Sequence, residues 1–116
     1  MAINFETTDP SRLLEAFKKA IRDGNVVTWA VDKDGDFYHT PDQWTRRGWL
    51  RPTAYTGRLT LNFIPSTAFK TRWADLGVIQ GRFIESMIMH CNQLFDTASA
   101  TARPTNSDQI NTTATA

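Results

Sequence analysis

Several features that mark common classes of protein are missing from this sequence of 116 residues. A single cysteine, Cys91, excludes an intramolecular disulfide and a zinc site with four thiolate ligands. There is no run of about eighteen apolar residues that could span a bilayer. The first ten residues also lack the basic segment and apolar run of a secretory signal. We therefore expect a cytoplasmic protein with no membrane partner.

Short motifs of familiar enzyme chemistries are also lacking. There is no glycine-rich phosphate loop, no serine nucleophile elbow and no zinc-protease motif. Asp32, Asp34 and Asp36 resemble the opening of a calcium loop, but Phe37 and Gln43 stand where such a loop needs glycine and glutamate. We therefore predict no metal site, no cofactor and no assigned catalytic residue.

One enzyme alternative stays open, a small hydrolase that uses His39 or His90, the only histidines. Either ring would need a concave pocket in which it meets a carboxylate. Cys91 lies on the apolar side of a predicted helix, which is typical of a core residue and not of a nucleophile. We favour a protein that is not an enzyme.

Two segments have the apolar spacing of amphipathic helices. The first follows Asp9 and Pro10, a start signal, and ends at Gly24. The second extends over residues 76–95, where apolar residues recur for about five turns. Residues 65–75, just before it, are expected to form a loop or a short irregular helix.

Two hairpins are predicted between these helices. In the first, Asp34-Gly35 is taken as a two-residue turn, which places Val31 opposite Tyr38. Side chains alternate along a strand, so this register puts Phe37 and His39 on the outer face, away from the core. A short helix from Thr40 to about Arg47 is expected to follow.

The second hairpin turns at Thr56-Gly57, which pairs Tyr55 with Arg58 and Leu50 with Phe63. The predicted core face then contains Leu50, Pro52, Ala54, Leu59, Leu61 and Phe63. The predicted outer face contains Trp49, Arg51, Thr53, Tyr55, Arg58, Thr60, Asn62 and Ile64. Pro52 has no amide hydrogen to donate, which favours an edge strand or a bulge.

These elements predict an α+β fold in the order α-β-β-short α-β-β-α. It is a small antiparallel sheet of two hairpins with two long helices packed on one face. Residues 1–95 are expected to form this single domain. Residues 96–116 contain six threonines and five alanines and one large apolar side chain, Ile110. We predict that they form a disordered tail, whose removal after Asp96 should leave thermal stability nearly unchanged.

The sequence from Trp44 to Arg82 contains seven basic residues and one acidic residue, with aromatic residues among them. The predicted registers bring only part of this set to the outer sheet face. The candidate binding residues there are Phe37, His39, Trp49, Arg51, Tyr55 and Arg58, flanked by the basic residues Arg46 and Arg47.

Rings beside guanidinium groups suit two kinds of partner. We expect a non-enzymatic protein that binds another protein or a second copy of itself, for example through a strand edge. The alternative is a nucleic-acid-binding protein that uses the same residues. A third interpretation is that Tyr55 and Arg58 only stack on each other, while Trp49 and Ile64 are covered by residues 65–75.

Overall fold

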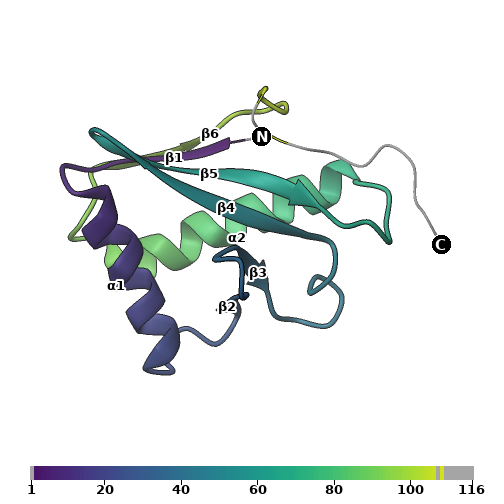
Figure 1. The fold of residues 1–116 in the computed structure, drawn as a ribbon, viewed down its shortest axis with the longest axis horizontal. Helices are drawn as coiled ribbons and strands as arrows, with labels where there is room; N and C mark the ends of the chain where they lie inside the picture. Colours follow the sequence, from purple (N-terminus) through teal and green to yellow (C-terminus); the bar gives the residue numbers. More distant parts are fainter. Residues whose placement is uncertain (1, 107, 109–116) are drawn as a thin grey trace.

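Six antiparallel strands and two helices make up the part of the chain that the computed structural model describes, residues 2–106 and 108. The strands lie in the order β2-β3-β4-β5-β1-β6, with α2 behind the sheet and α1 at one end (Figure 1). The predicted α+β class, with two helices packed on the sheet, is confirmed. The strands are β1 (Ala2–Glu6), β2 (Trp29–Val31), β3 (Phe37–His39), β4 (Gly48–Tyr55), β5 (Arg58–Pro65) and β6 (Thr97–Ala100).

The two long helices are confirmed, with small changes at their ends. α1 (Pro10–Arg22) begins where predicted, because the Asp9 carboxylate accepts a hydrogen bond from the Arg12 backbone N–H at 3.1 Å. α2 (Trp73–Cys91) begins before residue 76 and ends before residue 95. Leu94 and Phe95 continue the apolar spacing beyond the helix and still pack against the core.

The second hairpin has the predicted register. Tyr55 pairs with Arg58, and Leu50 pairs with Phe63. Leu50, Leu59, Leu61 and Phe63 are buried on the helix side of the sheet. β4 lies between β3 and β5 in the strand order, but its pairing with β3 is confined to Leu50 and Phe37. Pro52 pairs with Leu61 of β5 and lies beyond the end of the β3 ladder, which agrees with an edge position for a residue that has no amide hydrogen.

The predicted register of the first hairpin is wrong by one residue. The Asp32 N–H donates to the Asp36 carbonyl at 2.9 Å, and Gly35 has a φ of 86°. The loop therefore contains three residues, a form in which glycine takes the left-handed position. Val31 now pairs with Phe37 and Trp29 with His39. Since a shift of one residue exchanges the two faces of a strand, the prediction that Phe37 and His39 face outward is wrong, and both are buried.

The predicted short helix from Thr40 to Arg47 is replaced by overlapping turns. The N–H groups of Trp44 and Thr45 both donate to the Pro41 carbonyl, at 2.8 and 3.0 Å. The segment is too short to offset the cost of starting a helix, and β4 begins at once with Gly48.

Two strands were not expected from the sequence. β1 lies between β5 and β6, and its alternating residues Ile3 and Phe5 are fully buried. β6 pairs with β1 over Thr97–Ala100, so the prediction of disorder is wrong for these residues. Residue 107 and residues 109–116, which the same prediction covered, lie outside the described residues.

An aromatic cluster forms the centre of the core. The Phe83 ring of α2 has its centroid 5.0–6.1 Å from the rings of Phe5, Phe17, Trp29 and Phe37. Tilted and edge-to-face pairs of this kind add specific geometry to the burial of apolar area. The cluster ties both helices to β1, β2 and β3. Neither of the two helices has the length and apolar character needed to cross a membrane, as far as the chain is described.

Candidate binding surfaces

Arg51, a predicted binding residue, is held in an ion pair on the outer side of the sheet. Its Nε and Nη2 atoms donate to the two carboxylate oxygens of Asp36 at 2.9 and 2.8 Å. The hydrogen bond and the negative charge of Asp36 raise the pKa of Arg51. Asp36 is nearly buried, so this guanidinium serves first to compensate a carboxylate of the same chain.

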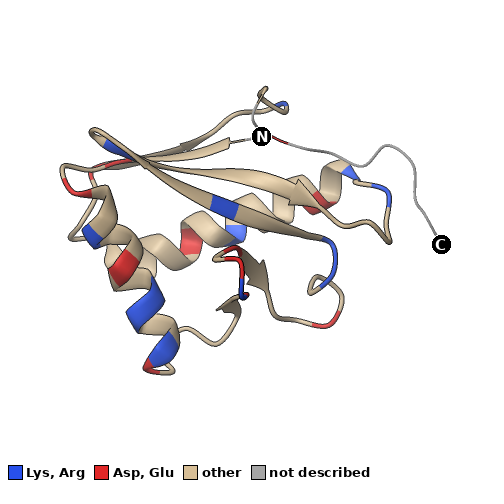
Figure 2. Cartoon of the chain, in the orientation of Figure 1, with Lys and Arg blue, Asp and Glu red and all other residues tan. Residues whose placement is uncertain are grey.

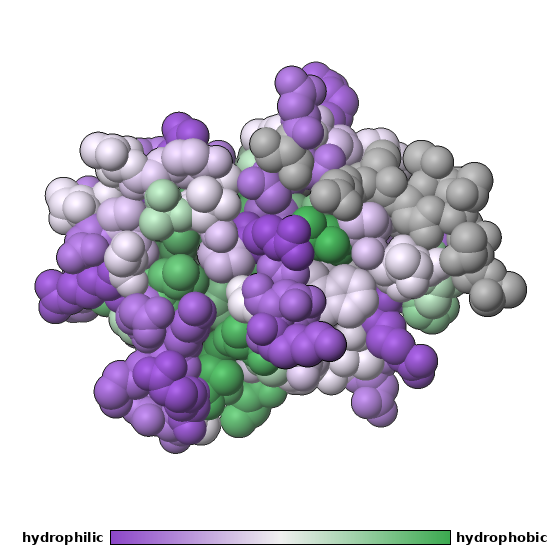
Figure 3. Space-filling model, viewed as in Figure 1, coloured by the Kyte–Doolittle hydropathy of each residue, from purple (hydrophilic) through white to green (hydrophobic). Residues whose placement is uncertain are grey.

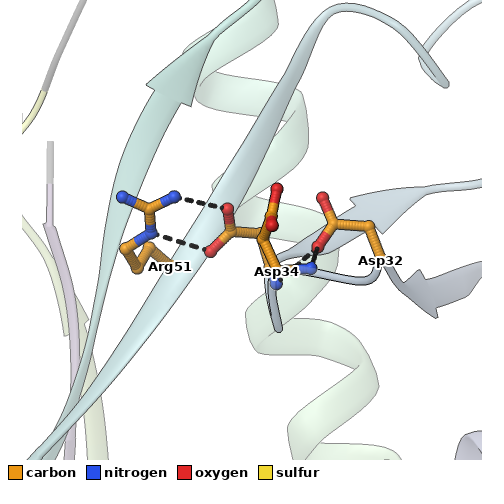
Figure 4. Close-up of polar contacts among 4 residues, drawn as sticks. Asp32, Asp34 and Arg51 are labelled. Atoms are coloured by element: carbon orange, nitrogen blue, oxygen red, sulfur yellow. Dashed lines mark hydrogen bonds and ion pairs between the residues drawn. The ribbon is translucent and has the colours of Figure 1, made fainter.

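The carboxylates of the β2–β3 loop have different hydrogen-bond partners, and Figure 4 shows the Asp32 side chain apart from Arg51. One Asp32 carboxylate oxygen accepts the backbone N–H groups of Asp34 and Asp36, each at 2.9 Å, while the Asp36 carboxylate turns to Arg51. Within residues 2–106 and 108, no group of three histidine, cysteine or acidic side chains could hold a metal ion. The resemblance to a calcium loop therefore does not extend to geometry.

Tyr55 and Arg58 remain exposed at the far end of the β4–β5 hairpin. The guanidinium carbon of Arg58 lies 4.7 Å from the Tyr55 ring centroid. Arg58 Nε donates to the Thr60 hydroxyl at 3.2 Å, and this hydroxyl donates to the Asn4 side-chain oxygen at 2.8 Å. The cross-strand stacking considered from the sequence is thus present. A polar groove of about 340 Å³ beside it is also lined by Glu6 and Ser99.

The other predicted residues are dispersed. Trp49 is half-buried opposite Ile64. Arg47 lies over the Phe69 ring, with its guanidinium carbon 4.0 Å from the centroid, while Arg46 is exposed. The structure thus leaves Trp49, Arg51, Tyr55 and Arg58 on the outer side of β4 and β5, without Phe37 and His39.

The outer face carries little net charge. Figure 2 shows few charged residues along the strands, whereas α1 carries several basic residues and one acidic residue. Arg51 is paired with Asp36, and Arg58 lies opposite Glu6 in the β1–β5 register. A surface of this kind lacks the cluster of unpaired cations by which proteins bind phosphate backbones.

His39 lies in a pocket on the helix side of the sheet and makes contacts that define its protonation. Its Nδ1–H donates to the Thr28 carbonyl at 2.7 Å, and Nε2 accepts from Arg82 Nη1 at 3.2 Å. Burial and the charge of Arg82 lower the pKa of His39, although the Thr28 carbonyl opposes this shift. Both ring nitrogens are engaged, so the neutral ring has no free lone pair for general base catalysis.

The other residues considered for catalysis are placed in two different environments. His90 is exposed in the last turn of α2. Cys91 is buried on the same helix, as predicted, and burial raises the pKa of its thiol. A thiol of raised pKa carries little of the nucleophilic thiolate at neutral pH.

An apolar groove that the sequence did not indicate lies between α1 and the free edge of β2. It has a volume of about 340 Å³ and is lined by Ile21, Ala30 and Val31, with Lys18 and Arg22 on the helix side. Figure 3 shows hydrophobic surface between the polar end of α1 and the middle of the molecule. The apolar spacing of α1 predicted that Ile21 faces inward, but a sequence does not show which strand leaves such a face partly open.

Comparisons with known proteins add no relative. No family model matches the sequence, and neither the curated proteins nor the solved structures contain a significant match.

Proposed function

We propose that this chain is a non-enzymatic binding protein that holds an extended segment of a partner protein against the free edge of β2. The observation that supports this proposal best is the apolar groove lined by Ile21, Ala30 and Val31 beside that edge. An edge strand offers unpaired backbone groups to an incoming strand, and an adjacent apolar pocket selects its side chains.

The charges around the groove favour a partner segment with acidic residues. Lys18 and Arg22 lie on the α1 side, and Lys18 has only a long contact of 3.8 Å with Glu15. Complementary charge at the rim speeds association and selects among partners more than it adds affinity. The preferred segment therefore combines apolar side chains, which enter the groove, with flanking carboxylates.

The outer sheet face, which the sequence favoured, is the alternative surface for the same function. It still presents Tyr55 and Arg58 beside a polar groove. The nucleic-acid alternative has less support, because Arg51 is paired with Asp36 and Arg58 lies opposite Glu6. Retention of single-stranded probes that weakens steeply with salt would restore it.

Photocrosslinking distinguishes the two surfaces. A photoreactive amino acid is placed at Ala30, in the groove, or at Thr53, on the outer face of β4, and crosslinked species are compared in cells that express the chain natively. Binding in the groove predicts a discrete adduct from position 30 and none from position 53. Crosslinking to a second copy of this chain identifies a homodimer, which sedimentation of the purified protein tests independently.

Charge reversal supplies a matched control. Lys18→Glu with Arg22→Glu should remove the adduct, because both changes place negative charge at the groove. Arg12→Glu with Lys19→Glu makes the same change of net charge at exposed positions of α1 outside the groove lining and should leave the adduct in place. An adduct that survives the first pair, or that arises only from position 53, would contradict the proposed site.

A further inference from the structure

The pocket beside His39 is lined by charged and polar side chains that can form further hydrogen bonds. It has a volume of about 350 Å³ between the β2–β3 hairpin and α2, within the range of small-molecule sites. From α2 it is lined by Arg82 and, about one helical turn later, by the consecutive residues Glu85 and Ser86. Thr28 and His39 line the other side. The pocket does not overlap the groove at the β2 edge.

Arg82 brings a positive charge to this pocket that no carboxylate balances closely. Among residues 2–106 and 108, no acidic oxygen forms an ion pair with Arg82 within 4.0 Å. One of its N–H groups donates to His39, and its guanidinium carbon lies 5.7 Å from the Trp44 ring centroid. These contacts orient the guanidinium and leave further donors for an anionic ligand.

Ser86 adds a second polar group. The residue is 7% exposed and lines the pocket wall. A serine hydroxyl can donate a hydrogen bond to a carboxylate, so it offers a ligand a contact beside Arg82. Arg82 and Ser86 are four residues apart, hence on the same side of α2.

Glu85 gives the pocket a second charge of opposite sign. It is exposed, lines the same pocket, and its charge acts on His39. A simple anion would be repelled by this carboxylate, whereas a ligand with one acidic and one basic group would satisfy both ends. His39 is neutral in this arrangement, because its Nε2 atom accepts a hydrogen bond from Arg82, which can only donate.

We propose that this pocket binds a free amino acid, whose carboxylate is held by Arg82 and Ser86 and whose ammonium group is held by Glu85. The site goes beyond the partner surface proposed above and depends on none of its residues. The ligand makes only non-covalent contacts, so the pocket is a binding site and not a catalytic centre.

NMR titration tests the proposal with the free L-amino acids as probes. The indole N–H signal of Trp29 reports on the pocket, because its ring stacks on His39 with centroids 4.6 Å apart, and Trp29→Phe assigns it. We expect at least one amino acid to shift this signal saturably. The matching acid without the amino group, and the matching amine without the carboxylate, should each bind about tenfold more weakly.

Three variants separate the contributions. Ser86→Ala, which leaves the contacts of Arg82 and His39 intact, should weaken binding about tenfold. Glu85→Gln should abolish the preference for the amino acid over the matching acid. Arg12→Lys, far away on α1, should change nothing. The proposal is overturned if no amino acid shifts the Trp29 signal, if the matching acid binds as tightly, or if Ser86→Ala and Glu85→Gln leave affinity unchanged.

Discussion

Removal of the Arg51 guanidinium should destabilise the protein, because Asp36 would lose its partner. The Asp36 side chain is 5% exposed and the Arg51 side chain 52%. Breaking a fully buried ion pair typically costs about 3–5 kcal/mol, whereas exposed pairs contribute about 0.2–1 kcal/mol. With one partner buried and the other half in water, we expect Arg51→Met to lower the free energy of unfolding by about 1–2 kcal/mol.

A double-mutant cycle separates the pair from its surroundings. Asp36→Asn keeps the size of the side chain and removes its charge, while Arg51→Met removes the guanidinium and keeps an unbranched apolar stem. The losses in unfolding free energy of the two single variants should sum to about 1 kcal/mol more than the loss of the double variant. This difference is the coupling energy of the pair. Urea unfolding can be followed by tryptophan fluorescence, because Trp29 is buried in β2 and becomes exposed on unfolding.

Arg58→Met is the matched control. The same substitution at the other outer-face arginine removes a hydrogen bond to Thr60 and the contact with the Tyr55 ring, but it leaves no buried charge without a partner. The expected loss is therefore within about 0.5 kcal/mol. Additive single changes in the Arg51–Asp36 cycle, or an unchanged unfolding midpoint for Arg51→Met, would refute the structural role of the pair. Arg51 would then be free for a ligand, as the sequence first suggested.

Three further predictions concern stability. Gly77→Ala should raise the free energy of unfolding by about 0.5–1 kcal/mol, because an added Cβ meets nothing within 4 Å on this exposed helix face; a lower urea midpoint would contradict this. Ending the chain after Asp96 removes β6 and the hydrogen bonds of Asp108 to Asn62 and Phe63, so the melting temperature measured by circular dichroism should fall by about 4–8 °C or more. The pKa of His39 is lowered on folding, so its contribution to stability is present above about pH 6.5 and is lost as the pH falls towards the folded pKa. Urea midpoints measured down this pH range should therefore decrease, and an increase would show that the folded state favours the charged ring.

Local signals in the sequence were sufficient for the elements whose partners are near in the chain. The β4–β5 register followed from one turn, Thr56-Gly57, and from the alternation of Leu59, Leu61 and Phe63. α1 followed from Asp9, Pro10 and a regular apolar spacing. In each case, the turn or cap and the hydrophobic pattern indicate the same structure.

Long-range pairing explains the strands that were missed. Ile3 and Phe5 alternate with polar residues, which is a strand signal, but their partners Leu61 and Leu59 lie more than fifty residues away. β6 has no large apolar side chain, and its order depends on pairing with β1. Composition alone therefore predicted disorder, because the composition of a segment does not show that the edge of β1 is available for pairing.

The first hairpin shows how a small error in a turn changes a functional argument. Asp34-Gly35 is compatible with loops of two or three residues, and only the second brings Phe37 onto the Phe83 ring and Asp36 beside Arg51. Tertiary contacts thus choose between two loops of similar local preference. The candidate site changed with that choice, since two of its six residues moved to the opposite face of the sheet.

That same shift produces the amino-acid pocket. With the two-residue turn, His39 would face solvent as a possible base; with the observed turn, it lies between the Thr28 carbonyl and Arg82 and is held neutral. The neutral ring orients Arg82 through a hydrogen bond. Because the ring has no negative charge, the positive charge of Arg82 stays available to an anionic group of a ligand. The histidine that first suggested a hydrolase is therefore better explained as a residue that positions the arginine of a binding site.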